Sequence, residues 1–235
     1  MDALMTPEFW FAVGQIVMID ILLGGDNAVV IALACRNLPP ELRRRGIVWG
    51  TMGAIALRIV LIFFAMSLLK LPYLKLVGAA ALLWIGIKLL VPDDDDHGDL
   101  KASDKLLGAI RTIIVADFVM SVDNVIGIAG AAQGAAREGQ QGHEMALVIF
   151  GLLVSIPIIV WGSTLVLKLM DRFPLIVTAG GMLLGWIAGT LAVTDPAAVP
   201  YVSGTETARY AAGSAGAVLV LAAGTLLARR ATNKA

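Results

Sequence analysis

Long apolar runs alternate with short polar loops along the whole chain. Seven of these runs approach or exceed the roughly 20 residues that an α-helix needs to cross a bilayer. They cover residues 9–34, 46–69, 74–91, 106–132, 146–169, 174–193 and 208–228. The runs are continuous, whereas the strands of a membrane barrel show short alternating segments. The pattern therefore predicts an all-α membrane protein with seven transmembrane helices.

Composition supports this class. The chain has 235 residues, of which 58% are hydrophobic and 15% are charged. Soluble domains use about 45–50% apolar and about 25% charged residues. We treat residues 1–235 as a single transmembrane domain whose first partner is the lipid bilayer. The formal net charge is zero, so nothing in the charge balance suggests a nucleic-acid partner.

The loops differ in their content of Lys and Arg. The loops after the first, third and fifth runs and the C-terminal tail hold Arg36, Arg43, Arg44, Arg45, Lys101, Lys105, Lys168, Arg172, Arg229, Arg230 and Lys234. The opposite side holds only Lys70, Lys75, Arg137 and Arg209. Basic loops stay on the cytoplasmic side. We expect a multi-pass protein of the cytoplasmic membrane with its N-terminus outside and its C-terminus in the cytoplasm.

One polar motif occurs twice inside the apolar runs. Asp20 is followed six positions later by Asp26-Asn27, and Asp117 is followed six positions later by Asp123-Asn124. The offset is constant, since 117 − 20 and 123 − 26 both give 97. Each Asp at the centre of a span disfavours membrane insertion by roughly 2.5–3.5 kcal/mol. Intramembrane carboxylates at this cost indicate an ion path, a proton relay or a buried charge partner.

The repeat extends beyond the motif. Gly78 and Trp84 of the third run correspond to Gly180 and Trp186 of the sixth, at an offset of 102. Residues 9–91 and 106–193 are therefore predicted to be two copies of a three-helix unit. An odd number of spans per copy forces opposite orientations, which is the inverted repeat typical of secondary transporters. The seventh helix, at 208–228, has no counterpart; it either packs on the bundle or forms a contact in a homo-oligomer.

The spacing of the motif also predicts how the carboxylates are arranged. Residues six apart on a helix are separated by about 9 Å and about 120° around the axis. In two crossing, oppositely directed helices this gives two layers at the repeat interface. The outer layer would hold Asp20, Asp123 and Asn124, and the inner layer Asp26, Asn27 and Asp117. Gly24-Gly25 is expected to let the first helix unwind, and Ser121 to add a hydroxyl.

The predicted metal ligands are Asp20, Asp26, Asn27, Asp117, Asp123 and Asn124. Asp26 and Asp123 are the strongest candidates because each lies beside an Asn. This all-oxygen set suits Mg²⁺, Ca²⁺ and Mn²⁺ and disfavours Zn²⁺ and Cu⁺. Carboxylates can also bind protons once the ion has left, so exchange of a cation for protons is a further hypothesis.

Other interpretations remain open for these residues. The Asp and Asn side chains are alternatively structural groups that bridge helices, protonated or paired with Arg58. Asp20 and Asp117 alternatively orient the ligands or carry protons. Arg58 either neutralises an Asp when the site is empty or extends to an interface. The acidic loop of Asp93, Asp94, Asp95 and Asp96 is a solvated loop or a metal sensor.

The motifs resemble those of the TerC family of integral membrane proteins, and in particular its short seven-helix, YjbE-like branch. The resemblance covers nearly the whole chain and includes Gly24-Gly25-Asp26-Asn27, Ser121-Val122-Asp123-Asn124, Ser155-Ile156-Pro157, Trp161-Gly162-Ser163 and Asp171-Arg172-Phe173-Pro174. The family is similar to LysE-type exporters, and several members are associated with manganese export. The resemblance thus implies efflux of Mn²⁺, whereas the residues alone indicate an oxygen-ligand site for a divalent cation.

We therefore expect a secondary transporter and not an enzyme, with no catalytic residue and no bound cofactor. The transported ion is expected to be Mn²⁺, with Ca²⁺ and Mg²⁺ as alternatives. Two other functions remain open: a LysE-like exporter of a small organic solute, and a membrane scaffold or chaperone that binds metal without moving it. An intramembrane aspartyl protease is disfavoured because that chemistry needs one Asp pair, and this chain has four Asp in two repeated motifs.

Overall fold

The structure is a computed structural model. It describes the backbone at residues 7–68, 71–91, 102–135, 141–202 and 205–232. Within these ranges, the side chains at 7–9, 12, 15–16, 19, 21–24, 65–68, 123–135, 141–147 and 231–232 lie outside the description.

The described chain consists of seven α-helices, which confirms the predicted all-α class. They are α1 (Pro7–Cys35), α2 (Pro40–Leu68), α3 (Leu74–Leu90), α4 (Ala102–Ala135), α5 (Gln141–Arg172), α6 (Leu175–Val193) and α7 (Glu206–Thr232). Each predicted run lies within or closely overlaps one helix. Helix α2 begins earlier than its apolar run, at Pro40, because proline is well suited to the first turn of a helix.

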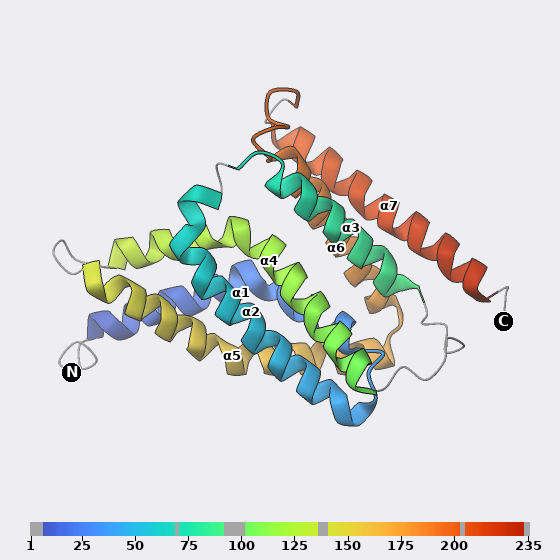
Figure 1. Ribbon diagram of the computed structural model, residues 1–235, viewed down its shortest axis with the longest axis horizontal. Helices are drawn as coiled ribbons and strands as arrows, with labels where there is room; N and C mark the ends of the chain where they lie inside the picture. Colours follow the sequence, from blue (N-terminus) through green and yellow to red (C-terminus); the bar gives the residue numbers. More distant parts are fainter. Residues whose placement is uncertain (1–6, 69–70, 92–101, 136–140, 203–204, 233–235) are drawn as a thin grey trace.

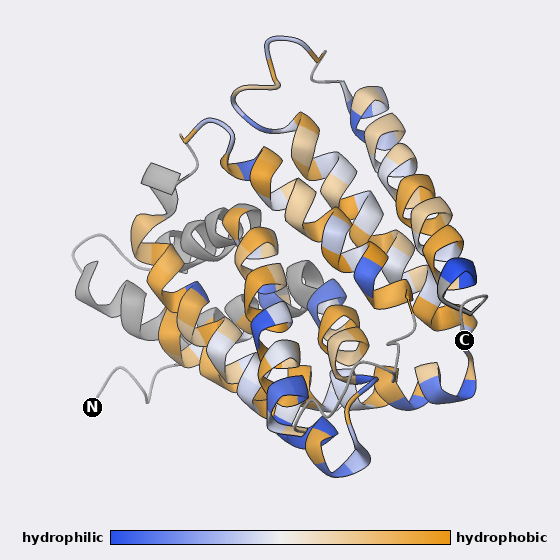
Figure 2. Cartoon of the chain, turned by 45° about the vertical axis from the view of Figure 1, so that its right-hand side comes forward, coloured by the Kyte–Doolittle hydropathy of each residue, from blue (hydrophilic) through white to orange (hydrophobic). Residues whose placement is uncertain are grey.

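Four of the helices have described segments long and apolar enough to cross a membrane: Pro40–Phe64, Val148–Arg172, Leu175–Val193 and Glu206–Arg230. Hydrophobic residues cover most of the helix surfaces, and hydrophilic residues gather mainly near helix ends (Figure 2). This is the distribution of a multi-pass helical membrane protein. Seven spans and their orientation remain predictions.

The helices form two groups (Figure 1). Helices α3, α6 and α7 lie side by side in one group, and α1, α2, α4 and α5 form the other. Between the groups, α4 contacts α3, and α1 contacts α6. The surface between the groups therefore brings the two Asp-containing helices, α1 and α4, against α6 and α3.

Helix pairing follows the two halves of the sequence. Helix α1 packs extensively on α5, and α2 packs extensively on α4. If α1, α2 and α3 are exchanged with α4, α5 and α6 in that order, the α1–α5 pair becomes the α4–α2 pair. The α3–α6 pair is unchanged by the exchange. This pairing fits the predicted inverted repeat; the symmetry itself stays a prediction.

Glycines allow α6 and α7 to approach at backbone distance. A Cβ atom added at Gly185 would clash with the backbone of Gly216, and one added at Gly189 would clash with the backbone of Ala212. Small residues at such positions are typical of helix pairs in membranes. The seventh helix thus packs on the bundle, as one of its two interpretations proposed.

The start of α3 is fixed by a side chain from beyond the end of α6. Tyr73, the residue before α3, has a left-handed backbone with φ of 68°. The carboxylate of Asp195 accepts hydrogen bonds from the backbone N–H groups of Tyr73 (2.9 Å), Lys75 (3.0 Å) and Leu76 (3.2 Å). It therefore satisfies the free N–H groups that a helix start leaves without intrahelical partners.

Candidate functional site

A single arginine joins the first Asp of the two motifs. Arg58 of α2 donates from Nη1 to Asp20 Oδ1 of α1, and from Nη2 to Asp117 Oδ1 of α4 at 2.5 Å. All three side chains are buried, with exposed fractions of 1% for Arg58 and Asp20 and 5% for Asp117. A charge in such surroundings needs an opposite charge and hydrogen bonds, and within this cluster Arg58 supplies both to the two Asp side chains.

Ser121 completes one side of this cluster. Its hydroxyl accepts a hydrogen bond from Arg58 Nε at 2.9 Å and donates to Asp117 Oδ2 at 3.0 Å. Both oxygens of Asp117 are therefore hydrogen-bonded. Asp20 differs, since its buried Oδ2 accepts a hydrogen bond from no described residue. The expected contribution of a Ser121 hydroxyl is present, directed at Arg58 and Asp117.

The structure corrects the predicted layers. Asp20 and Asp117 were assigned to separate layers, but they lie on the same guanidinium. Positions along two helices do not fix where a charged side chain from a third helix enters between them. Of the two interpretations of Arg58, the structure shows the counter-ion, because its guanidinium is buried instead of extending to an interface.

Arg58 has a neutral counterpart in the second half of the chain. Adding the motif offset gives 58 + 97 = 155, which is Ser155 of α5. Ser155 is fully buried and lies near Asp20, while its hydroxyl donates to Gly151 O at 3.1 Å. Equivalent positions are buried in both helices: Thr51 with Val148, Ala54 with Gly151, Ile55 with Leu152, and Arg58 with Ser155. The two halves thus supply one cation, not two, to the pair of Asp side chains.

Asp26 lies apart from the guanidinium, beside a small polar cavity. It is half-buried, and its Oδ1 accepts a hydrogen bond from the backbone N–H of Asn27 at 3.0 Å. The cavity has a volume of about 110 Å³ and is lined by Asp26, Met120, Ile187, Thr190, Leu191, Thr194 and Arg209. Its walls come from α1, α4, α6, the residue after α6, and the start of α7. The cavity therefore lies beside Asp26 near the end of α6 and the start of α7.

The remaining predicted ligands divide into two sets. Asn27 is buried, and neither atom of its side-chain amide has a hydrogen-bond partner among the described residues. Asp123 and Asn124 belong to α4, but their side chains lie outside the described residues, as does the acidic loop at 93–96. Among the side chains that the structure describes, no three His, Cys, Asp or Glu gather closely enough to hold a metal ion.

The backbone around the first motif is regular. Helix α1 runs from Pro7 to Cys35 through Gly24-Gly25 without interruption. The expected unwinding at these glycines is therefore wrong for this structure, because intrahelical hydrogen bonds are kept where two glycines only weaken the helix.

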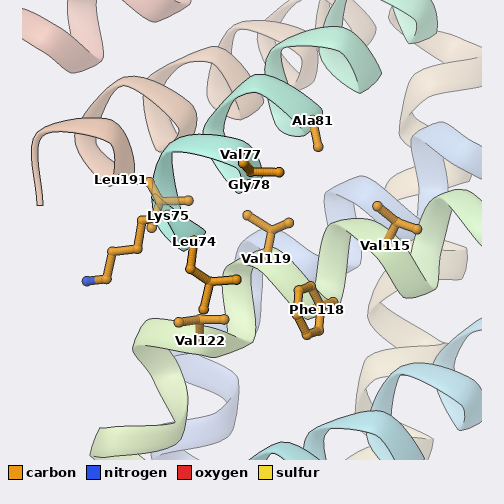
Figure 3. Close-up of a pocket in the computed structure, with 10 residues that line it drawn as sticks. All are labelled: Leu74, Lys75, Val77, Gly78, Ala81, Val115, Phe118, Val119, Val122 and Leu191. Atoms are coloured by element: carbon orange, nitrogen blue, oxygen red, sulfur yellow. The ribbon is translucent and has the colours of Figure 1, made fainter. Parts of the chain in front are cut away.

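A second cavity lies between α3 and α4 (Figure 3). It has a volume of about 170 Å³ and apolar walls, including Val77, Phe118 and Val119. The one charged side chain at its edge, Lys75, points away from the other lining residues (Figure 3). Walls of this kind offer no ligands to a cation, so the candidate site is the Asp20–Arg58–Asp117 cluster together with Asp26 and Asn27.

The sequence did not place five polar residues next to the buried carboxylates or at the start of α3: Ser155, Asp195, Thr190, Thr194 and Arg209. Ser155 could have been found by applying the motif offset to Arg58. The others gave no signal, because their neighbours in space come from distant parts of the sequence.

Comparison with known proteins gives a consistent assignment. Residues 5–234 match the family described as integral membrane protein TerC family. The chain is 43% identical over 191 residues to the uncharacterized membrane protein YjbE of Bacillus subtilis, covering 81% of this chain and 83% of that protein. It is 24% identical over 204 residues to the uncharacterized membrane protein YkoY of the same organism, covering 82% and 63%. It is also 20% identical over 185 residues to the inner membrane protein YgdQ of Escherichia coli, covering 72% and 74%. No solved structure matches the chain.

Proposed function

The chain belongs to the integral membrane protein TerC family, and from this premise we propose that it is a secondary transporter for a divalent metal cation. We propose export of Mn²⁺ across the cytoplasmic membrane, with the N-terminus outside. The observation that carries the proposal is the placement of three motif carboxylates: Asp20 and Asp117 around one buried guanidinium, and Asp26 beside a polar cavity.

The charge of the cluster supports a divalent cargo. Asp20, Asp117 and Asp26 carry three negative charges when ionised, and Arg58 carries one positive charge. Arg209, which also lines the cavity, is paired with Glu206. The three Asp and Arg58 are then left with two negative charges, which one divalent ion neutralises. A transmembrane carboxylate without such compensation is costly.

The available atoms support an oxygen-ligand ion. Asp20 Oδ2 and the Asn27 side-chain oxygen are buried, and neither has a hydrogen-bond partner among described residues. Asp26 adds a carboxylate at the cavity. Mn²⁺, Mg²⁺ and Ca²⁺ are the ions that carboxylate and amide oxygens suit. Asp123 and Asn124 would supply the matching groups from the second motif.

With the N-terminus outside, the cavity beside Asp26 opens toward the outer face, where an exported ion leaves. The proposed cycle then returns protons to the carboxylates, which hold them until the next ion binds. Alternating access would expose Asp26 to the two faces in turn.

The test is Mn²⁺ flux in proteoliposomes, comparing the intact protein with Asp26→Asn and Asp123→Asn. Each substitution removes a ligand charge with little change in shape, and we expect flux to fall to the level of liposomes without protein. The matched control is Asp171→Asn, which removes an exposed carboxylate paired with Arg43 and should leave flux unchanged.

Two other results would overturn export. If the purified protein binds Mn²⁺ but does not transport it, the protein is a metal scaffold or chaperone and not an exporter. If Mn²⁺ neither binds nor moves, an organic solute with an amino group is the next cargo to assay.

A further inference from the structure

The Asp20–Arg58–Asp117 cluster has the composition of a cation site in which the Arg58 guanidinium occupies the place of the cation. Two carboxylates from different helices contact one cation between them. A transported metal ion would need these same oxygens. A guanidinium and a divalent ion repel each other, so both cannot bind the pair at once.

The cluster is also incompletely satisfied. Asp117 uses both oxygens, on Arg58 and Ser121, whereas Asp20 leaves Oδ2 without a hydrogen-bond partner among described residues. A purely structural ion pair at this burial is expected to satisfy every oxygen, since each unpaired one is costly. The neighbouring Ser155 hydroxyl donates to Gly151 O and can turn toward Asp20. We take Asp20 Oδ2 as the oxygen of the pair that an incoming cation binds first.

Arg58 is carried by a different helix from the two carboxylates that it contacts. Its guanidinium is at the end of a long side chain on α2, while the carboxylates belong to α1 and α4. Asp26 makes no described contact with Arg58, but its charge acts on the guanidinium. The equivalent position in the second half is Ser155, which carries no charge, so one cation serves both Asp.

We infer that Arg58 is a tethered competitor for the transported cation: Asp20 and Asp117 bind either its guanidinium or the cargo ion. Arg58 thereby sets the affinity of the site and assists release of the ion. This inference rests on the proposed cation transport and adds to it a residue that determines affinity.

The first experiment is Mn²⁺ binding to purified protein in lipid nanodiscs, measured by titration calorimetry. Arg58→Gln removes the competing charge, and we expect it to bind Mn²⁺ about 10-fold more tightly or better, with slower turnover in proteoliposomes. Arg58→Lys keeps a cation and should stay close to the intact protein. The matched control, Arg44→Gln, changes an exposed arginine at the start of α2 and should change neither quantity.

A second experiment restores the competitor from solution. In Arg58→Ala, added guanidinium ion should weaken Mn²⁺ binding, whereas the same concentration of K⁺ should not. The intact protein should respond equally to both salts. A purely structural Arg58 gives no such difference, and an equal response of Arg58→Ala to guanidinium and K⁺ would overturn the inference.

A charge-matched pair covers the possibility that Arg58→Gln fails to fold. Asp20→Asn combined with Arg58→Gln keeps the net charge of the intact cluster, and we expect it to bind Mn²⁺ at least about 10-fold more tightly than Asp20→Asn alone. Equal or weaker binding by the double variant would contradict a competing role.

The results separate this inference from the function on which it rests. If the intact protein binds and moves Mn²⁺ while removal of Arg58 leaves binding unchanged or weaker, only the competitor role fails. If neither the intact protein nor Arg58→Gln binds Mn²⁺, the proposed cargo fails, and the competitor role fails with it.

Discussion

Two buried carboxylate clusters in this protein are held in different ways. At the end of α6, Asp195 accepts hydrogen bonds from backbone N–H groups of Tyr73, Lys75, Leu76 and Ala197. Asp20 and Asp117 are instead held by side chains: Arg58 contacts both, and Ser121 also donates to Asp117. One oxygen of Asp20 has no hydrogen-bond partner among described residues. Backbone donors cannot leave without unfolding a helix start, but a side chain can change its rotamer. The comparison therefore separates an Asp held by backbone donors from Asp residues held by side chains, and only the second kind suits the exchange of partners proposed above.

The largest effect should come from removing the negative charge around Arg58. Asp20→Asn combined with Asp117→Asn leaves a buried cation without compensation, and we expect a loss of about 3–5 kcal/mol in the free energy of unfolding. Adding Arg58→Met to this double variant should recover most of that loss while leaving Mn²⁺ flux abolished. Denaturant unfolding in detergent, followed by circular dichroism, measures the stability. A triple variant no more stable than the double would show that the loss does not come from charge.

The Asp195 cluster should show the opposite pattern. Asp195→Ala leaves several N–H groups at the start of α3 without their acceptor, and we expect a loss of about 2–3 kcal/mol in the same unfolding measurement. The folded variant should bind Mn²⁺ with the affinity of the intact protein, since Asp195 lies outside the candidate site. A selective loss of metal binding would remove the distinction between the two clusters.

The sequence predicts most of the fold but only part of the site. The seven helices follow from apolar runs, and the doubled motif marks Asp20 and Asp117 because intramembrane carboxylates are rare. Their shared partner could not be fixed, because the direction in which Arg58 points depends on how α2 is rotated against α1 and α4. Asp195 gave no signal at all, since its partners are backbone groups of residues 73–76, about 120 positions away. The spacing of residues along one helix can be read from the sequence, whereas contacts between helices depend on how the helices pack.

Strong acid should weaken the Asp195 cluster. Burial alone would raise the pKa of Asp195, but the backbone N–H donors of Ala197, Tyr73, Leu76 and Lys75 outweigh it, and the pKa lies below its ordinary value. A carboxyl group whose pKa is lower in the folded state stabilises the fold at pH values above its unfolded-state pKa of about 3.9. This stabilisation is lost as the pH falls through the folded-state pKa. We expect the thermal midpoint to fall as the pH is lowered below about 4. Asp195→Asn should fall less steeply over that range; an equal slope would assign the acid sensitivity to other groups.

The smallest effect belongs to the exposed ion pair between Arg43 Nη1 and Asp171 Oδ2, which are 2.8 Å apart. This pair joins the start of α2 to the end of α5 at the surface, where solvent screens the charges. Asp171→Asn should change the free energy of unfolding by about 0–1 kcal/mol. A larger loss in the unfolding measurement would mean that this contact fixes the relative position of the two helices.

The close packing of α7 on α6 has a consequence for movement. Because the backbones of Gly185 and Gly216, and of Gly189 and Ala212, allow no added side-chain atom between them, α6 and α7 can neither slide nor separate without losing that fit. Together with α3, which contacts both, they would move as one rigid body. A rocking motion would then have its hinge surface against α1 and α4. Asp26 lies at that surface, in a cavity that α6 and α7 help to line, so the same motion would open and close the cavity around it.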